Sequence, residues 1–436
     1  MGIVWVRWCQ FFAGDLKMNI LVIDSFMAAY STRIRQNMKS LLITHDFPPG
    51  LSGGISVFQH HLCAELKNEI NVLAPKLGNW KAFDSKQEYT IFRQTMPKVP
   101  SGFMRNMKMR IWHIVYLVYI AVFQFNLYVI NGCRIVIREK IDVVLIGHLY
   151  LAPVVWFIQL ITKRPYVIIL YGSELHRYWR FRQVRKLILA WLNRAEFLLV
   201  ISEFTRRQYL SRGVRDNQTF VCVSPGVDVE RFHPDLNPAD VVHRHALTRR
   251  AVVLTVARLV EWKGQDNVIR AMSRVIQVVP NAVYVMVGAG QHHPVLEQLV
   301  TELGLQECVI FAGFIPEEEL GQYYAAADVM VLVGREFQPG MPVEGFGIAY
   351  IEANAVERPV IGSRLGATPD TIVDGVTGLL VAPDDDEEIA KCIIRLLVNP
   401  YLAKQMGKNG RERAIREFTW HTQATRLRRQ LAVIEP

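Results

Sequence analysis

The chain has 436 residues, of which 51% are hydrophobic and 21% are charged. This length exceeds what one hydrophobic core usually supports, so we expect two domains, and the apolar content excludes a disordered chain. The formal net charge of +10 favours an anionic partner, but no recognition motif indicates nucleic acid. Six scattered cysteines without a Cys-x-x-Cys pair predict reduced thiols and no zinc site, which is typical of a cytoplasmic protein.

The first 37 residues differ in character from the rest of the chain. They show no clear amphipathic period, and they lack the order of charged, apolar and small residues that marks a signal peptide. Met38 then opens the segment MKSLLITHDFPP, in which a buried strand runs into a loop. We therefore expect 1–37 to be an N-terminal extension, with Met38 as the natural start.

Short β-branched segments alternate with longer helical patterns through the first half of the chain. The expected strands lie at 40–44, 70–75, 142–147, 166–172, 197–202 and 220–226. Because these segments are almost continuously apolar, they predict a parallel sheet with helices on both faces. The pattern defines an expected N-terminal, acceptor-side Rossmann-like domain at 38–228.

The same alternation begins again after a polar stretch at 235–250. The expected strands of this second sheet lie at 251–259, 282–290, 309–314, 328–333 and 359–363. We expect a second Rossmann-like domain at 229–410 and a C-terminal helical segment at 411–436 that could pack back on the first domain. The predicted fold is therefore α/β, with two doubly wound domains facing a cleft that is the expected site.

Two loops at the ends of strands carry candidates for binding phosphate. Gly53 and Gly54 precede a helical pattern, where glycines let the backbone approach an anion, although an ordinary strand-to-helix turn explains them equally well. Arg258 and Lys263 follow another strand and could straddle a diphosphate. The alternative for this pair is two solvated cations on a loop.

The segment VEGFGIAYIE places two acids eight residues apart around a glycine turn. Gly347 and Ile348 begin a helix, whose free amides favour phosphate. Glu344 precedes the helix and Glu352 lies about two turns into it, so the two carboxylates can reach different parts of one long ligand. With the cations above, this pattern predicts a nucleotide-sugar site, whereas the alternative is one capping acid and one surface acid.

The motifs together resemble the retaining GT-B glycosyltransferases of family 4. The matching segments are SGGISVF, ARLVEWKG, VGAG, FAGF and the E-x7-E motif in VEGFGIAYIEA, which span about 45–390. The segments THDFPPGLSGGI, LYGSEL and ISEFT are especially similar to those of phosphatidylinositol mannoside α-mannosyltransferases that use GDP-mannose. The resemblance implies a metal-independent hexosyltransferase that uses a nucleotide-sugar donor and no cofactor.

The resemblance also implies roles for individual residues. Charge on the leaving diphosphate would be stabilised by Arg258 and Lys263, the donor sugar would be bound by Glu344 and the ribose by Glu352. Phosphate would meet the backbone amides of Gly347 and Ile348, and the diphosphate would be approached by Gly53 and Gly54. His148, which follows a strand, matches a histidine near the transferred sugar, although a strand-end histidine in a packed turn is the alternative. The implied reaction is a front-face displacement with retention, without an enzymatic nucleophile.

Other functions remain open at this point. One is a transferase that uses a UDP-sugar on a soluble or polysaccharide acceptor, and GATPDTIVDG departs from the family with Asp370 in place of the usual glutamate. Another is a non-catalytic nucleotide-sugar-binding protein, although all the motif residues are present. An NAD-dependent oxidoreductase is less favoured because the VGAG segment lacks the third glycine of the dinucleotide fingerprint. The acids at 384–386 indicate a helix start, not a metal site.

Two segments bear on membrane contact. The segment at 111–130 has no charged residue, but it lies within the α/β alternation, so we expect a buried or interfacial helix. The segment at 176–194 is basic and amphipathic, which fits either a helix packed on the sheet or one that lies on an anionic membrane. We expect a cytoplasmic protein with a lipid or glycan acceptor, in peripheral contact with the inner membrane face.

Overall fold

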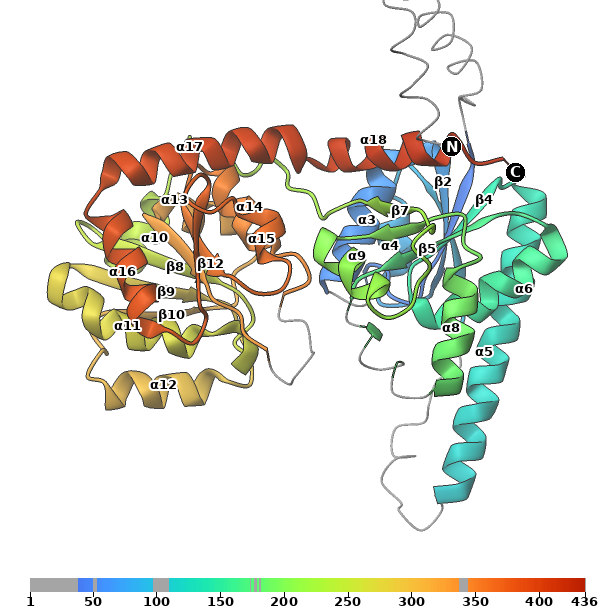
Figure 1. The fold of residues 1–436 in the computed structure, drawn as a ribbon, viewed down its shortest axis with the longest axis horizontal. Helices are drawn as coiled ribbons and strands as arrows, with labels where there is room; N and C mark the ends of the chain where they lie inside the picture. The colour runs from blue at the N-terminus through green and yellow to red at the C-terminus, as the bar shows by residue number, and fades with distance from the viewer. Residues whose placement is uncertain are drawn as a thin grey trace, which may run out of the picture.

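Two α/β bodies make up the computed structural model (Figure 1). The structure describes residues 38–49, 53–96, 110–172, 174–175, 179, 182–336 and 344–435, and of 110–120 it describes the backbone only. The expected extension at 1–37 therefore lies outside the described residues.

The first body contains a seven-stranded parallel sheet with the order β3-β2-β1-β4-β5-β6-β7. Its strands are β1 (Ser40–Ile43), β2 (Ile70–Pro75), β3 (Thr90–Gln94), β4 (Val143–Ile146), β5 (Tyr166–Leu170), β6 (Leu198–Val200) and β7 (Phe220–Cys222). Its helical segments are α3 (Gly54–Leu66), η1 (Lys67–Glu69), α4 (Trp80–Asp84), α5 (Arg110–Arg138), η3 (Leu149–Leu151), α6 (Ala152–Thr162), α8 (Arg182–Leu192) and α9 (Glu203–Leu210).

The alternation of side chains along each strand distributes the core of this body over two faces. In β1, Leu42 points into the cluster that includes α3, whereas Leu41 and Ile43 point into the cluster that includes α5, α6 and α8. Both faces are therefore apolar, which is why the strands read as continuous hydrophobic runs.

The second body contains a six-stranded parallel sheet with the order β10-β9-β8-β11-β12-β13. Its strands are β8 (Ala251–Val256), β9 (Ala282–Val287), β10 (Val309–Gly313), β11 (Val329–Leu332), β12 (Val360–Ser363) and β13 (Gly378–Val381). Its helical segments are α10 (Ala239–Arg244), η4 (Glu261–Lys263), α11 (Gln265–Val278), α12 (His293–Glu302), α13 (Leu320–Ala326), α14 (Ile348–Ala355), α15 (Thr368–Thr371), α16 (Asp386–Leu397) and α17 (Pro400–Glu417), and the last helix, α18 (Trp420–Leu431), follows them in the chain.

Two doubly wound parallel sheets were predicted, and this fold class is confirmed. The sequence patterns missed β3 and β13, each of which is one edge strand of its sheet, although the opposite edge strands, β7 and β10, were predicted. The strand β3, with the sequence TIFRQ, is largely half-buried, so it lacks the continuous apolar run used to find the others. Contact with a single neighbouring strand leaves more of β3 in solvent.

The last two helices connect the bodies. In Figure 1, α17 lies along the second body and α18 continues over the first, where it contacts α3. A backbone bridge joins Val227 to Thr419, and Arg428 of α18 pairs with Glu69 at 2.9 Å. The chain thus passes between the bodies twice, and both crossings lie beside each other.

The long helix α5 covers the segment that was expected to be a buried or interfacial helix. Its described C-terminal part buries Tyr128, Ile135 and Val136 and leaves its opposite side exposed. Within the described part of the chain, no helix combines the length and apolar character needed to cross a membrane.

Candidate active site

A cavity of about 510 Å³ opens at the carboxyl ends of both sheets, between the two bodies. Seven of the nine candidate residues line it: Gly53, Gly54, Arg258, Lys263, Glu344, Gly347 and Ile348. The other two, Glu352 and His148, lie close by but not on its wall. The carboxyl ends of parallel strands in such folds are where ligands bind, so the position agrees with a binding site.

The loop that carries Arg258 and Lys263 is held tightly against the sheet. It leaves β8 and forms the short turn η4, and Gly264 then begins α11 with a φ of +73°. A Cβ at this glycine would lie 2.1 Å from the carbonyl oxygen of Val333, so a side chain cannot be accommodated. This close approach explains why a glycine directly follows the lysine.

The two cations have different surroundings. Lys263 Nζ lies 2.5 Å from Glu344 Oε2, and both side chains are only 15% exposed. Arg258 is exposed, and in the described part of the chain no carboxylate pairs with it. The wall of the cavity therefore carries one free guanidinium beside a largely buried ion pair, which suits an anion that brings its own charge.

The start of α14 supplies backbone donors to the same cavity. Gly347 is the N-cap with a φ of +90°, and a Cβ there would lie 2.4 Å from the ring of Tyr350. The hydroxyl of Tyr350 donates a hydrogen bond to the carbonyl of Leu332, which anchors the helix to the end of β11. The first amides of a helix lack carbonyl partners one turn back, and Ile348 and Ala349, which begin α14, line the cavity.

Glu352 lies about one turn after Ile348 on α14. It lines an adjoining cavity of about 210 Å³, which shares Gly54 and Ile348 with the larger one. Tyr324 donates a hydrogen bond of 2.7 Å to Glu352 Oε2. Burial raises the pKa of Glu352 to about 7, so the carboxyl is partly protonated near neutral pH.

His148 lies behind the cavity wall, at the end of β4. Its ring stacks on Tyr150, with centroids 5.3 Å apart, and its centroid lies 6.3 Å from that of Tyr171, which lines the cavity. Burial and then the neighbouring His45 lower the pKa of His148 to about 4, so the imidazole is neutral at pH 7. Its Nε2 atom is buried without a hydrogen-bond partner among the described residues.

Sequence analysis did not single out Asp46, Tyr171 or Gln59. Asp46 and Tyr171 line the cavity, and burial raises the pKa of Asp46. Gln59 is buried, and its Nε2 donates to Tyr171 Oη at 2.8 Å and to the carbonyl of Gly147 at 3.0 Å. The position of Asp46 directly after β1 is a signal that could have found it, but no local pattern links Gln59 to the other two.

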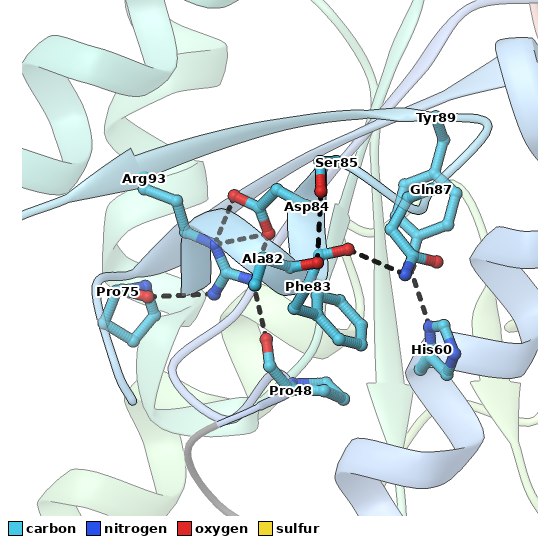
Figure 2. A network of polar contacts seen from close by, with 10 residues as sticks. All are labelled: Pro48, His60, Pro75, Ala82, Phe83, Asp84, Ser85, Gln87, Tyr89 and Arg93. Atoms are coloured by element: carbon cyan, nitrogen blue, oxygen red, sulfur yellow. Dashed lines mark hydrogen bonds and ion pairs between the residues drawn. The ribbon is translucent and has the colours of Figure 1, made fainter. Parts of the chain in front are cut away.

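A buried arginine holds Pro48, which follows β1. Figure 2 shows Arg93 of β3 surrounded by acceptors, namely Asp84 of α4 and two main-chain carbonyls. Its guanidinium lies 2.7 Å from Asp84 Oδ1, 3.0 Å from the carbonyl of Pro75 and 2.6 Å from that of Pro48. This network ties the loop after β1 to the end of β2 and to α4.

Acidic groups elsewhere serve other purposes. Asp385 accepts a hydrogen bond from the amide of Glu388 at 2.8 Å and caps α16. Asp370, the departure from the family pattern, accepts the amide of Phe204 at 2.8 Å and so joins the two bodies. Among the residues that the structure describes, no group of three or more His, Cys, Asp or Glu side chains could hold a metal ion.

Comparison with protein families agrees with this geometry. Residues 52–231 match the family described as Glycosyltransferase Family 4, and residues 242–413 match that described as Glycosyl transferases group 1. A protein of Mycolicibacterium smegmatis named GDP-mannose-dependent alpha-(1-6)-phosphatidylinositol monomannoside mannosyltransferase is 31% identical over 398 residues, covering 89% of this chain and 96% of the relative. A Corynebacterium glutamicum protein, the GDP-mannose-dependent monoacylated alpha-(1-6)-phosphatidylinositol monomannoside mannosyltransferase, is 34% identical over 53% of this chain and 61% of its own length.

Solved structures show the same fold at lower identity. HepE from Anabaena, in complex with UDP and glucose, superposes with a TM-score of 0.71 at 19% identity, over 91% of this chain and 100% of that chain. The sucrose-phosphate synthase of Thermosynechococcus elongatus has a TM-score of 0.67 at 23% identity, over 89% and 97% of the two chains. The two facing Rossmann-like bodies are thus a GT-B fold. The chain belongs to the family 4 glycosyltransferases and is itself a glycosyltransferase.

Proposed function

We propose that this glycosyltransferase moves an α-mannosyl group from GDP-mannose to a lipid or glycan acceptor, with retention of configuration and without a metal ion. The observation that carries the proposal is the cavity of about 510 Å³, which is lined by Arg258, the Lys263–Glu344 pair and the first residues of α14. The printed names of the two mannosyltransferase relatives support the choice of donor and of a lipid-linked acceptor.

The chemistry follows from where charge develops. The acceptor hydroxyl oxygen bonds to the anomeric carbon while the bond from that carbon to the β-phosphate oxygen breaks, on the same face of the sugar. The hydroxyl proton passes to the leaving phosphate, and GDP departs. Arg258 and Lys263 stabilise the charge on that phosphate, which is an electrostatic contribution that needs no protein nucleophile.

The remaining candidates contact different parts of the donor. Glu344, which pairs with Lys263, accepts hydrogen bonds from hydroxyls of the donor sugar, and Glu352 accepts them from hydroxyls of the ribose. The first body contributes Gly53 and Gly54 to the diphosphate and the neutral His148 to the transferred sugar. Because His148 is uncharged at pH 7, it acts as a hydrogen-bonding group and not as a cation.

The first experiment is a thermal-shift titration with GDP, UDP, ADP and NAD, because a ligand that binds only the folded protein raises its melting temperature. Stabilisation by GDP should be followed by transfer from GDP-mannose to phosphatidylinositol mannoside, measured as GDP release. The Glu344→Ala variant should retain its fold and lose most of this transfer. Wild-type turnover in that variant would mean that Glu344 is misassigned.

A UDP-sugar donor is the second candidate, and the structural similarity to HepE with UDP and glucose favours it. Stabilisation by UDP and not by GDP would favour the UDP-sugar donor. The acceptor would then be sought among soluble glycans or polysaccharides. A protein that binds nucleotide sugars without turnover would instead be stabilised but inactive with every donor. In the leading proposal, the enzyme is cytoplasmic and peripheral on the inner membrane face, where a lipid acceptor is available.

A further inference from the structure

Three neighbouring helices of the first body leave large apolar side chains in solvent. The helices α5, α6 and α8 lie along one side of that body (Figure 1), and Phe125 of α5 meets Phe157 of α6 edge to face at 5.4 Å. Five of their apolar side chains keep 49–69% of their surface exposed: Val122, Ile130, Ile137, Ile161 and Leu187. We call the outward faces of these three helices the helical flank.

The spacing on α5 explains why one face of that helix is unburied. Val122, Ile130 and Ile137 are separated by eight and seven residues, or about two turns each, and so lie on one side of the helix. Tyr128 and Ile135 lie on the other side and are buried in the core. A helix that is apolar all round is expected where both of its sides meet an apolar environment.

The charge of the helical flank is of one sign. The sequences of α5, α6 and α8 contain no aspartate or glutamate, although the chain has 40 of these residues. The cations within them are Arg110, Arg134, Arg138, Arg182, Arg185 and Lys186. Those of α8 are exposed, and Arg138 pairs with Glu139, which lies just beyond the end of α5.

We propose that the helical flank docks on an anionic lipid bilayer, with its apolar side chains among the acyl chains and its cations at the headgroups. Apolar and cationic side chains on one acid-free surface are what an interfacial contact requires. A second copy of the chain is a poor occupant, because a two-fold interface through this surface would oppose cations with cations.

From the sequence, α8 could either pack on the sheet or lie on a membrane. In the structure, some of its apolar side chains pack on the sheet and others remain exposed. Ile188 and Leu192 are buried in the core, whereas Val184 and Leu187 point away from it. The helix therefore packs on the sheet through one part of its apolar surface and contributes the other part to the helical flank. Residues 176–178, 180 and 181 of the same segment lie outside the described residues.

One helix of the helical flank begins close to the candidate site in the chain. The turn η3 follows His148 directly, and α6 begins at its end. A bilayer against α6 would thus lie on the same body as His148 and Tyr171. This inference rests on the proposed function, because it names the surface from which a lipid acceptor would be taken.

Sedimentation with vesicles tests the docking without any donor or acceptor. Wild-type protein should sediment at low salt with vesicles of phosphatidylglycerol and phosphatidylcholine, and much less with phosphatidylcholine alone or in 0.5 M salt. The Arg182→Gln/Arg185→Gln/Lys186→Gln variant should bind about a hundredfold more weakly, from about 1 kcal/mol for each basic side chain at such a surface. The Ile130→Ser/Ile137→Ser/Leu187→Ser variant should lose about tenfold or more, because its apolar contact is removed.

The matched control is Val278→Ser/Val295→Ser/Val398→Ser, which removes three apolar side chains of the second body that are 54–57% exposed. It should bind vesicles like the wild type. An equal loss of vesicle binding in the control and in the flank variants would overturn the proposal. Failure of the wild-type protein to sediment with anionic vesicles would also overturn it. A wild-type dimer that the flank variants convert to monomer would assign the surface to a second copy instead.

The same samples separate this inference from the proposed function. Each flank variant should keep the wild-type thermal shift with GDP, since the cavity is untouched. Vesicle binding without mannosyl transfer would leave the docking surface standing and reject the mannosyltransferase. Transfer to a short-chain, water-soluble acceptor by a protein that does not bind vesicles would support the mannosyltransferase and reject the docking surface.

Discussion

The two walls of the cavity are constructed differently. The wall from the second body takes Arg258 and Lys263 from one short loop and Glu344, Gly347 and Ile348 from another. The wall from the first body depends on contacts between distant segments, such as that between Gln59 and Tyr171, which are 112 residues apart. The first kind of wall leaves motifs in the sequence. Apart from Gly53 and Gly54, the second leaves scattered polar residues, whose role is recognisable only when the fold brings them together.

The largest effect on stability is expected at the buried Arg93 network of the first body. The side chain of Arg93 is only 2% exposed, so Arg93→Met would leave Asp84 and two carbonyls without their donor. We expect a loss of about 3–5 kcal/mol in the free energy of unfolding, measured with urea. The control is Arg274→Met, which removes an exposed pair with Asp386 and should change stability by less than about 0.5 kcal/mol. Equal losses would show that the buried network contributes nothing beyond a surface pair.

On the second body, Arg258→Ala tests the local motif. Because Arg258 is exposed and unpaired among the described residues, its removal should leave the melting temperature unchanged. Turnover should fall by about 10²–10³-fold, as when one group that stabilises developing charge is lost. Arg270→Ala, an exposed arginine on α11, should retain wild-type turnover. An unchanged rate in Arg258→Ala would remove its proposed contact with the diphosphate.

Gln59→Leu addresses the wall from the first body. The substitution removes the donor of two buried hydrogen bonds, to Tyr171 and to the carbonyl of Gly147, and should destabilise the protein by about 1–3 kcal/mol. We expect a higher KM for the lipid acceptor and an unchanged thermal shift with GDP. A weakened response to GDP with a normal acceptor KM would place Gln59 on the donor side. Gln59→Glu has nearly the same shape as the wild-type residue but lacks the amide donor. It therefore tests whether the effect comes from the lost donor and not from a change of shape.

The smallest effect concerns pH. The pKa of Glu352 is raised to about 7, so the folded protein holds this proton more tightly than the unfolded chain does. The resulting stability is complete below the usual pKa of a glutamate and is lost as pH rises through 7. Between pH 6 and pH 7, Glu352→Gln should therefore lose about 1 kcal/mol less than the wild type, measured by urea unfolding. Parallel losses in both proteins would mean that Glu352 does not titrate in this range.

Much of the site could be predicted because its signals are short. A glycine after Lys263 and a glycine before Ile348 mark places where the backbone turns sharply or approaches another segment. The structure brings these loops together on one wall, as the order of strands in a doubly wound sheet requires. His148 was a candidate because it follows a strand and matches a histidine of the family, but neither signal reveals that Tyr171, 6.3 Å from its ring, lines the cavity while His148 does not.

The edge strands and the exposed helices were harder to predict. The strand β3 is half-buried because it has one neighbour, and its Arg93 looks like a surface residue in the sequence. In α5, the apolar stretch predicts a buried or interfacial helix without separating the two, and the structure leaves Val122 and Ile130 54% and 49% exposed. Hydrophobicity identifies what avoids water, but it does not say whether protein or lipid covers it.

The sequence by itself determined the two parallel sheets and the loops that line the cavity, because β-branched runs, glycine turns and the order of motifs act over a few residues. Only the tertiary structure decided that Lys263 pairs with Glu344 across 81 residues, that Arg93 is buried among carbonyls, and that the acid-free helices lie side by side. These features depend on which segments become neighbours. That choice is made by the packing of whole elements, because burial and charge pairing are properties of the folded surface and not of any one segment.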